Sequence, residues 1–232
     1  MQETSKNRRT IRSFVRRTGR LTPSQSKALE ELWPKIGIEH DTQILDFEVV
    51  FSRSAPIVLE IGFGNGDSLA QMAEERPDKN FLGIEVYEAG IGHCLLMARD
   101  LALNNLRIVA HDAIEVLEHQ IPLASIARVN LYFPDPWPKK RHHKRRIVQP
   151  AFLDMIANRL KDEGTLNIAT DWAAYAEHID EVLSHSDRFI CTERREHGGE
   201  LPLERPRTKF ERRGLKKGHR IWDWRFEKKP NT

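Results

Sequence analysis

The amino-acid sequence predicts an α/β fold in which helices cover both faces of a doubly wound, mostly parallel sheet. Two patterns predict this fold. From residue 57 onward, short apolar runs alternate with stretches in which apolar residues recur at spacings of three and four. Acidic residues lie within or directly after four of the runs, where a parallel sheet forms its ligand-binding edge. The length of 232 residues suits one domain with extensions.

The expected elements follow in chain order. Residues 1–20 lack periodicity and are expected to form a flexible basic arm, with 21–232 as one domain, and a helix is expected over 22–33. Strands are expected at 57–59, 81–84, 106–110, 129–133 and 164–169. Further helices are expected at 67–75, 89–104 and 152–160, the last with Pro150 near its first turn. Residues 221–226 are expected to pair antiparallel at the far end of the sheet.

The composition argues against export and membrane insertion. No apolar run approaches the roughly 20 residues that span a bilayer. The two cysteines, Cys94 and Cys191, form neither a Cys-x-x-Cys motif nor a Cys/His cluster at zinc-ligand spacing. We therefore expect a cytoplasmic protein, a monomer or homodimer, that binds neither a membrane nor a metal.

Basic residues are concentrated in three segments, although the net charge is only +3. Residues 1–20, 139–146 and 204–220 hold 21 of the 37 Lys and Arg residues but only 3 of the 34 acids. The rest of the chain is therefore acidic. Basic clusters on an acidic body favour binding to a phosphate backbone. The alternative is solvated charge without a function, which suits a terminal run better than residues 139–146, in mid-chain.

A glycine-rich loop at residues 60–67 follows a strand and opens a helix. Its glycines allow positive φ angles and close approach of a ligand to the backbone, and they are Gly62, Gly64 and Gly66. Asp67 replaces the Gly or Ala of a dinucleotide-binding loop, and Glu60 adds negative charge where a pyrophosphate would lie, which disfavours NAD. S-adenosylmethionine carries a sulfonium and an ammonium but no phosphate, so it suits this acidic loop.

Four carboxylates are expected to meet at the carboxyl edge of the sheet, namely Glu60, Glu85, Asp112 and Asp135. Glu85 ends the next strand, where it can accept hydrogen bonds from two ribose hydroxyls. Asp112 could bind the adenine amino group. The alternative for each acid alone is a turn or helix-capping role.

Residues 133–138 (Phe-Pro-Asp-Pro-Trp-Pro) predict a rigid loop that holds Asp135 in place. Trp137 can either stack on an extruded base or pack in the core. A basic cluster follows and is expected to bind phosphate through Lys139, Arg141, Lys144, Arg145 and Arg146. His142 and His143 are expected to serve this loop rather than bind a metal.

These motifs resemble those of the bacterial tRNA (guanine-N7)-methyltransferases along nearly the whole chain. The matching segments are residues 11–17, 60–66, 133–146, 170–172 and 208–214. The proline-tryptophan-basic segment is the most specific of them. The resemblance implies a class I S-adenosylmethionine-dependent methyltransferase with a Rossmann-like sheet, tRNA as substrate and a variable-loop guanine as target.

The resemblance also assigns residues to roles. The methyl donor would contact the four strand-end acids, and Asp135 would also be the catalytic residue. The substrate would contact Lys139, Asp171, Thr208, Lys209, Phe210 and Glu211. Because N7 of neutral guanine carries a lone pair, no general base is needed, and Asp135 would stabilise the charge that develops on the purine.

Alternatives remain for the substrate residues and for the activity. Asp171 could cap a helix that extends to Leu183, and residues 208–214 could be a charged loop without a function, although Glu211 could pair with a base edge. The loop at residues 134–137 also resembles the Asp-Pro-Pro-Tyr loop of amino methyltransferases, which act on an exocyclic amine. A non-catalytic RNA-binding protein on the same scaffold is the third possibility.

Overall fold

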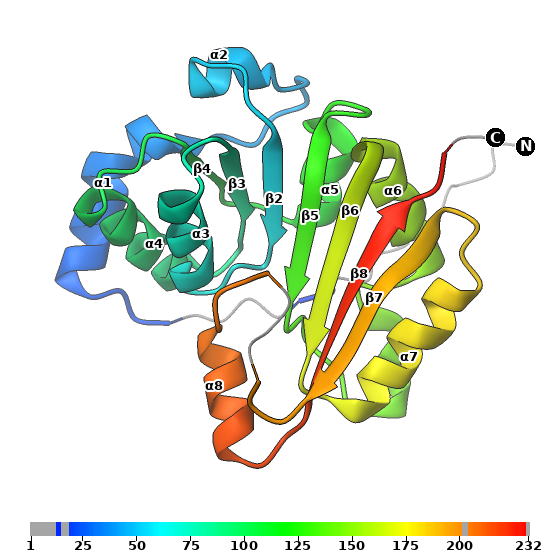
Figure 1. Ribbon diagram of the computed structural model, residues 1–232. Helices are drawn as coiled ribbons and strands as arrows, with labels where there is room; N and C mark the ends of the chain where they lie inside the picture. The colour runs from blue at the N-terminus through cyan, green and yellow to red at the C-terminus, as the bar shows by residue number, and fades with distance from the viewer. Residues whose placement is uncertain (1–12, 15–18, 201–203, 231–232) are drawn as a thin grey trace, which may run out of the picture.

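A computed structural model describes residues 13–14, 19–200 and 204–230. The basic arm expected at residues 1–20 falls mostly outside the described residues. The described part is built around an eight-stranded mixed sheet in the order β1-β4-β3-β2-β5-β6-β8-β7 (Figure 1). The prediction of an α/β fold with a mostly parallel sheet is confirmed.

The strands are β1 (Gly37–Ile38), β2 (Ile57–Ile61), β3 (Asn80–Ile84), β4 (Leu106–Val109), β5 (Ile126–Tyr132), β6 (Leu160–Thr170), β7 (Phe189–His197) and β8 (Ile221–Lys228). The helices are α1 (Pro23–Ile36), α2 (Phe47–Phe51), α3 (Asp67–Glu75), α4 (Glu88–Asp100), α5 (Ala113–His119), α6 (Pro150–Arg159), α7 (Ala173–Ser184) and α8 (Lys209–Lys216). A short 3-10 helix, η1, covers Lys140–Arg145. None of the helices described is long and apolar enough to cross a membrane.

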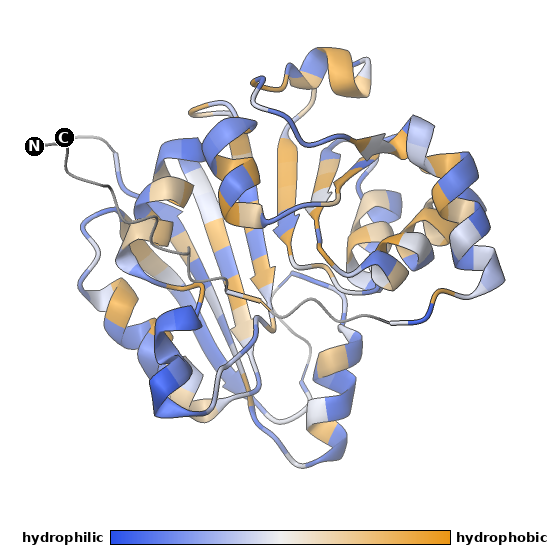
Figure 2. Ribbon diagram, turned by 180° about the vertical axis from the view of Figure 1, so that it is seen from behind, coloured by the Kyte–Doolittle hydropathy of each residue, from blue (hydrophilic) through white to orange (hydrophobic). Residues whose placement is uncertain are grey.

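Two hydrophobic clusters lie on opposite faces of the sheet. Side chains of α1, α3 and α4 pack on one face, and those of α5, α6 and α7 pack on the other. The middle strands are buried on both faces, and every residue of β2 and β3 is buried. Figure 2 shows the hydrophobic colour along β2 in the middle of the sheet. Such continuous apolar runs are typical of parallel strands covered by helices.

The strand order reverses at β2, which pairs in parallel with β3 on one side and with β5 on the other. The chain runs outward from β2 through β3 to β4 and then returns to β5. The loops that follow β2 and β5 therefore separate at their carboxyl ends, where open α/β sheets bind their ligands. This is the edge at which the acidic residues were expected to meet.

Three features of the sheet differ from the sequence prediction. The late strand is antiparallel, as expected, but it does not lie at the far end, because β8 is placed between β6 and β7. β7 forms the edge instead. It was not predicted, because six of its nine residues are exposed and the strand therefore lacks a run of apolar residues. β1 has two residues, which is too short for any periodicity.

Candidate active site

A cleft of about 390 Å³ opens at the carboxyl ends of β2, β3 and β5. Its volume is within the range of small-molecule sites. The expected site residues that line it are Glu60, Gly62, Gly64, Glu85, Asp135, Thr208, Lys209 and Phe210. Segments that are far apart in the sequence thus line one cleft. Gly66, Lys139, Asp171 and Glu211 do not line it, and Asp112 lies between two residues, His111 and Ala113, that do.

The glycine loop turns from β2 into α3 through positive φ angles. They are 71° at Gly62, 62° at Gly64 and 81° at Gly66, which confirms the expected left-handed turns. A side chain at Gly66 would also collide with Cys94. The loop rests on α4, because a Cβ atom at Gly90 would collide with the carbonyl oxygen of Gly64. The requirement for glycine at position 90 could not be predicted from the sequence, because it depends on how α4 packs.

Glu85 fixes the conformation of the glycine loop. Its Oε2 accepts a hydrogen bond from the backbone N–H of Gly64 at 2.7 Å. Its Oε1 accepts hydrogen bonds from the backbone N–H groups of Val86 at 2.6 Å and Tyr87 at 3.0 Å. The carboxylate therefore joins the ends of β2 and β3 at the cleft wall.

Glu60 is the most buried acid of the cleft, at 2% exposure. Burial raises its pKa to about 8, the attraction of Arg205 opposes this rise, and the repulsion of Glu85 adds to it. Its Oε2 is buried and has no hydrogen-bond partner among the residues that the structure describes. A buried acceptor of this kind at a ligand cleft fits a cationic hydrogen-bond donor.

Asp112 caps α5. Its side chain accepts a hydrogen bond from the backbone N–H of Ile114 at 3.0 Å, which confirms the capping alternative for this acid. Its position beside two cleft-lining residues leaves the expected adenine contact compatible with the cap.

The proline-rich loop after β5 holds Asp135 at the cleft in a half-buried position. Phe133 and Trp137 adopt positive φ angles of 52° and 46°. The guanidinium of Arg145 lies 3.8 Å from the centre of the Trp137 ring. This contact covers one face of the indole, so the ring neither packs in the core nor presents both faces to a base.

The described N-terminal residues Ser13 and Phe14 dock on this loop and line the cleft. The indole N–H of Trp137 donates to the carbonyl of Ser13 at 2.9 Å, and Arg145 donates to the carbonyl of Phe14 at 2.9 Å. The two described residues of the sequence motif at residues 11–17 thus lie at the same site as the loop.

Arg146 does not belong to the phosphate-binding cluster, which corrects the sequence prediction. It is 3% exposed and donates to the carbonyl of Pro136 at 3.0 Å and to that of Ala174 at 3.2 Å. Its guanidinium also lies 4.9 Å from the ring of Tyr175. Arg146 therefore braces the proline-rich loop against α7. The exposed members of the cluster are Lys139, Lys140, Arg141 and Lys144.

Asp171 does not cap α7, so the capping alternative is wrong for this residue. The N-cap is Trp172, which makes no side-chain capping bond. Asp171 instead accepts a hydrogen bond from Nδ1 of His219 at 3.0 Å. It also packs on Gly214, where an added Cβ atom would lie 2.7 Å from the Asp171 carboxylate. Asp171 thus joins the start of α7 to the end of α8.

Residues 208–214 form the beginning and most of α8 rather than a loop. Thr208 is the N-cap, and its hydroxyl accepts a hydrogen bond from the backbone N–H of Glu211 at 3.1 Å. Phe210 is 45% exposed and lies over the glycine loop, where an added Cβ atom at Gly64 would be 3.6 Å from its ring. Lys209 is exposed beside it. The first turn of α8 therefore forms one wall of the cleft.

Glu211 points away from the cleft and is fully buried. Arg205 donates to its Oε2 at 2.5 Å, and the other side of Arg205 donates to Asp223 at 2.9 Å. Asp223 is also hydrogen-bonded to Nε2 of His197 at 2.8 Å. The guanidinium of Arg205 lies 5.4 Å from the ring centre of Phe133, in the proline-rich loop. The sequence did not single out Arg205, because it stands among eight basic residues of one charged segment.

Comparison with known proteins shows the family to which the chain belongs. A family model described as "Putative methyltransferase" matches residues 54–224. Proteins named tRNA (guanine-N(7)-)-methyltransferase match almost the whole chain. The one from Aeromonas hydrophila is 53% identical over 226 residues, covering 97% of this chain and 95% of its own. The one from Halorhodospira halophila is 49% identical over 225 residues, covering 97% of each.

Solved structures of methyltransferases share the fold. A 16S rRNA methyltransferase, KamB, superposes with a TM-score of 0.58 at 16% identity, covering 81% of this chain and 95% of its own. An antibiotic-related methyltransferase superposes with a TM-score of 0.57 at 15% identity, covering 80% and 97%. The fold is that of the class I methyltransferases, and on near-full-length identity of about one half the chain belongs to the tRNA (guanine-N(7)-)-methyltransferase family.

Proposed function

We propose that this protein transfers the methyl group of S-adenosylmethionine to N7 of a guanine in the variable loop of tRNA. The observation that carries the proposal is the juxtaposition of Glu60, Glu85 and Asp135 with the first turn of α8 around one cleft. Acidic groups there suit a cationic methyl donor, and the basic residues Lys209 and Arg213, which also line the cleft, suit a polyanionic substrate. A tRNA substrate implies action in the cytoplasm.

The residues of the cleft fit the methyl donor. S-adenosylmethionine supplies an electrophilic methyl group on a sulfonium. Glu60 offers a buried oxygen without a partner among the described residues, which is suited to the donor's ammonium group. The positive φ angles of the glycine loop bring backbone groups close to the ligand. Glu85 and Asp112 are assigned the ribose hydroxyls and the adenine amino group.

The chemistry requires positioning and charge stabilisation rather than a base. N7 of guanine carries a lone pair and loses no proton when it is methylated, but the purine becomes positively charged. The Asp135 carboxylate accepts hydrogen bonds from the guanine and offsets this charge. The prolines on both sides of Asp135 and the contact of Arg146 with the Pro136 carbonyl would hold this carboxylate in place at the cleft.

The substrate contacts are divided between two elements. Lys139 and its exposed basic neighbours bind the phosphate backbone, and Thr208, Lys209 and Phe210 contact the nucleotide at the cleft. Asp171 and Glu211 do not line the cleft. They hold α8 in position through their hydrogen bonds with His219 and Arg205. We therefore assign positioning roles to these two acids.

The proposal is tested by incubating the purified protein with unmodified tRNA and radiolabelled S-adenosylmethionine, followed by digestion of the RNA to nucleosides. Label in 7-methylguanosine is the expected result. Label in a nucleoside methylated on its exocyclic amine would show that this amine, and not N7, is the target. Binding of tRNA without any label would favour the non-catalytic alternative.

A further inference from the structure

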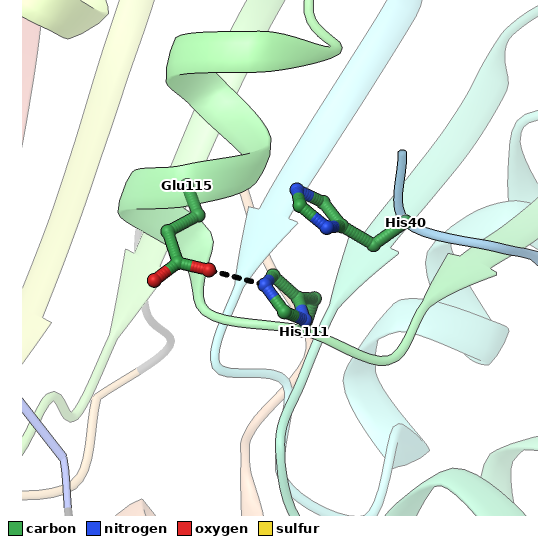
Figure 3. Close-up of side chains that lie close together, drawn as sticks. All are labelled: His40, His111 and Glu115. Atoms are coloured by element: carbon green, nitrogen blue, oxygen red, sulfur yellow. Dashed lines mark hydrogen bonds and ion pairs between the residues drawn. The ribbon is translucent and has the colours of Figure 1, made fainter. Parts of the chain in front are cut away.

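Three side chains that have no part in the proposed reaction meet at the carboxyl ends of β1 and β4, beside the first turn of α5. They are His40, His111 and Glu115 (Figure 3). In the parallel pairing of β1 with β4, Ile38 is opposite Val109. His40 lies two residues after Ile38, and His111 lies two residues after Val109. The strand register therefore brings the two rings together. Glu115 is four residues after His111, in the first turn of α5, and therefore shares its side.

The three side chains form a compact donor set. The imidazole rings of His40 and His111 are stacked, with ring centres 3.7 Å apart and planes at 9°. Nε2 of His111 is hydrogen-bonded to Oε2 of Glu115. One possible ligand atom from each of the three side chains lies within 4.8 Å of the other two.

The backbone that carries His40 is anchored on both sides. The Gln120 side chain donates to the carbonyl of Glu39 at 3.0 Å, and the backbone N–H of Leu45 donates to the carbonyl of Gln120 at 2.9 Å. The Glu39 carboxylate accepts a hydrogen bond from the indole of Trp33 at 2.6 Å. The position of His40 relative to α5 is therefore fixed before any ligand binds, as a metal site requires.

His40 has an unmet bonding requirement. Its Nε2 is buried and has no hydrogen-bond partner in the described part of the chain. Buried polar nitrogens without a partner are costly in folded proteins and call for an explanation, such as an ion. His40 is thus left beside a carboxylate that is already hydrogen-bonded to His111.

We propose that His40, His111 and Glu115 bind a divalent transition-metal ion, with Zn²⁺ as the best match. Two imidazoles and one carboxylate are a common three-ligand set for zinc with a fourth position open. The ion would replace the proton between His111 and Glu115 and satisfy His40. Tetrahedral zinc bonds of about 2.0–2.1 Å need a contraction of the donor set on the order of 1 Å, which side-chain rotation supplies.

The sequence analysis did not single out this site, because its ligands lie up to 75 positions apart and only the β1–β4 register unites them. It is also coupled to the cleft. His111 lines the cleft and directly precedes Asp112. A bound ion would hold the turn between β4 and α5, without taking part in methyl transfer.

The test is calorimetric titration of tag-free, chelator-treated, full-length protein with Zn²⁺ and, separately, with Mg²⁺. We expect one Zn²⁺ per chain and no binding of Mg²⁺, which prefers oxygen ligands. His40→Ala, His111→Ala and Glu115→Gln should each weaken Zn²⁺ binding by more than about tenfold. His185→Ala changes an exposed histidine on the protein surface and should leave it unchanged. Equal Zn²⁺ affinity in all these variants would overturn the proposal.

Thermal unfolding separates loss of the site from loss of the fold. Zn²⁺ should raise the melting temperature of the unmodified protein and of His185→Ala, but not that of His40→Ala. If His40→Ala does not fold, the absorption spectrum of the Co²⁺-loaded unmodified protein decides. Tetrahedral Co²⁺ bands support the site, whereas absence of stoichiometric Co²⁺ or Zn²⁺ binding to the unmodified protein refutes it.

Discussion

Arg205 donates to Glu211 across 2.5 Å, and neither side chain is more than 1% exposed. This buried pair ties the segment before α8 to the first turn of the helix, and Asp223 of β8 completes it from the other side. The pKa of Arg205 is raised, because Asp223 and Glu211 outweigh the effect of burial, which acts in the opposite direction. A charged cluster rather than an apolar one therefore sets the position of the cleft wall formed by α8.

Arg205→Met is expected to destabilise the protein by about 3–5 kcal/mol, because it leaves the Glu211 and Asp223 carboxylates buried without their cation. The measurement is the free energy of unfolding in urea. Glu204→Gln is the matched control, since Glu204 pairs with Arg128 but is 62% exposed and should lose no more than about 1 kcal/mol. Equal losses in the free energy of unfolding in the two variants would show that the buried cluster stabilises the protein no more than an exposed ion pair does.

Glu60 is expected to make stability depend on pH in the absence of cofactor. Its pKa is about 8 in the folded chain, mainly through burial, against 4.5 as the ordinary value. Between these values the folded state holds a proton that the unfolded state has lost. The free energy of unfolding should therefore fall as pH rises through this window, by at most about 1.4 kcal/mol per pH unit from this group.

Urea unfolding of the unmodified protein and of Glu60→Gln at several pH values across this window measures the effect. The amide cannot ionise, so the variant should lose the part of the slope that Glu60 causes. Identical slopes would mean that Glu60 is ionised in the folded protein at neutral pH.

Gly90→Ala is expected to weaken S-adenosylmethionine binding by at least about tenfold, because the added methyl group collides with the carbonyl of Gly64 and displaces the glycine loop. Calorimetric titration with the cofactor measures this loss. At Gly198 an added Cβ atom meets only the end of the Arg220 side chain at 3.4 Å, so Gly198→Ala should bind normally. Normal binding by both variants would show that the loop can move without loss.

Asp135→Ala is expected to lose turnover while it keeps most of its tRNA affinity, because the carboxylate acts on the charge that develops during transfer. The double variant Lys139→Ala and Lys140→Ala should instead bind tRNA more weakly and with a flatter salt dependence. Methyl transfer under single-turnover conditions and tRNA binding at several salt concentrations separate the two effects. An equal loss of tRNA binding in both would contradict this division of roles.

The sequence predicts the buried half of the sheet well. Every strand from β2 to β6 was expected, because burial on both faces requires continuous apolar runs, and α3 was predicted with its observed bounds. The glycine loop and the acids at strand ends were also predictable, since local backbone geometry and strand direction are enough to place them.

Features that depend on packing between distant segments were not predictable. In the sequence, the buried residues Arg146 and Arg205 cannot be told from basic residues exposed to solvent. Only their contacts in the folded chain show that they are buried. The edge strand β7 is mostly exposed, so it shows no apolar alternation. The meeting of His40 with His111 follows from strand register, which the sequence does not reveal.

β8 follows α8 in the chain but lies between β6 and β7 in the sheet (Figure 1). During synthesis, β7 and α8 leave the ribosome before the strand that joins them to the rest of the molecule. Until residues 221–228 have been translated, β7 lacks its neighbour in the described sheet, and Arg205 lacks Asp223. Assembly of the cleft wall is therefore expected to be a late event of translation. In a chain truncated before β8, β6 would have an open edge and β7 would lack its partner in the described sheet, and such exposed strands favour aggregation.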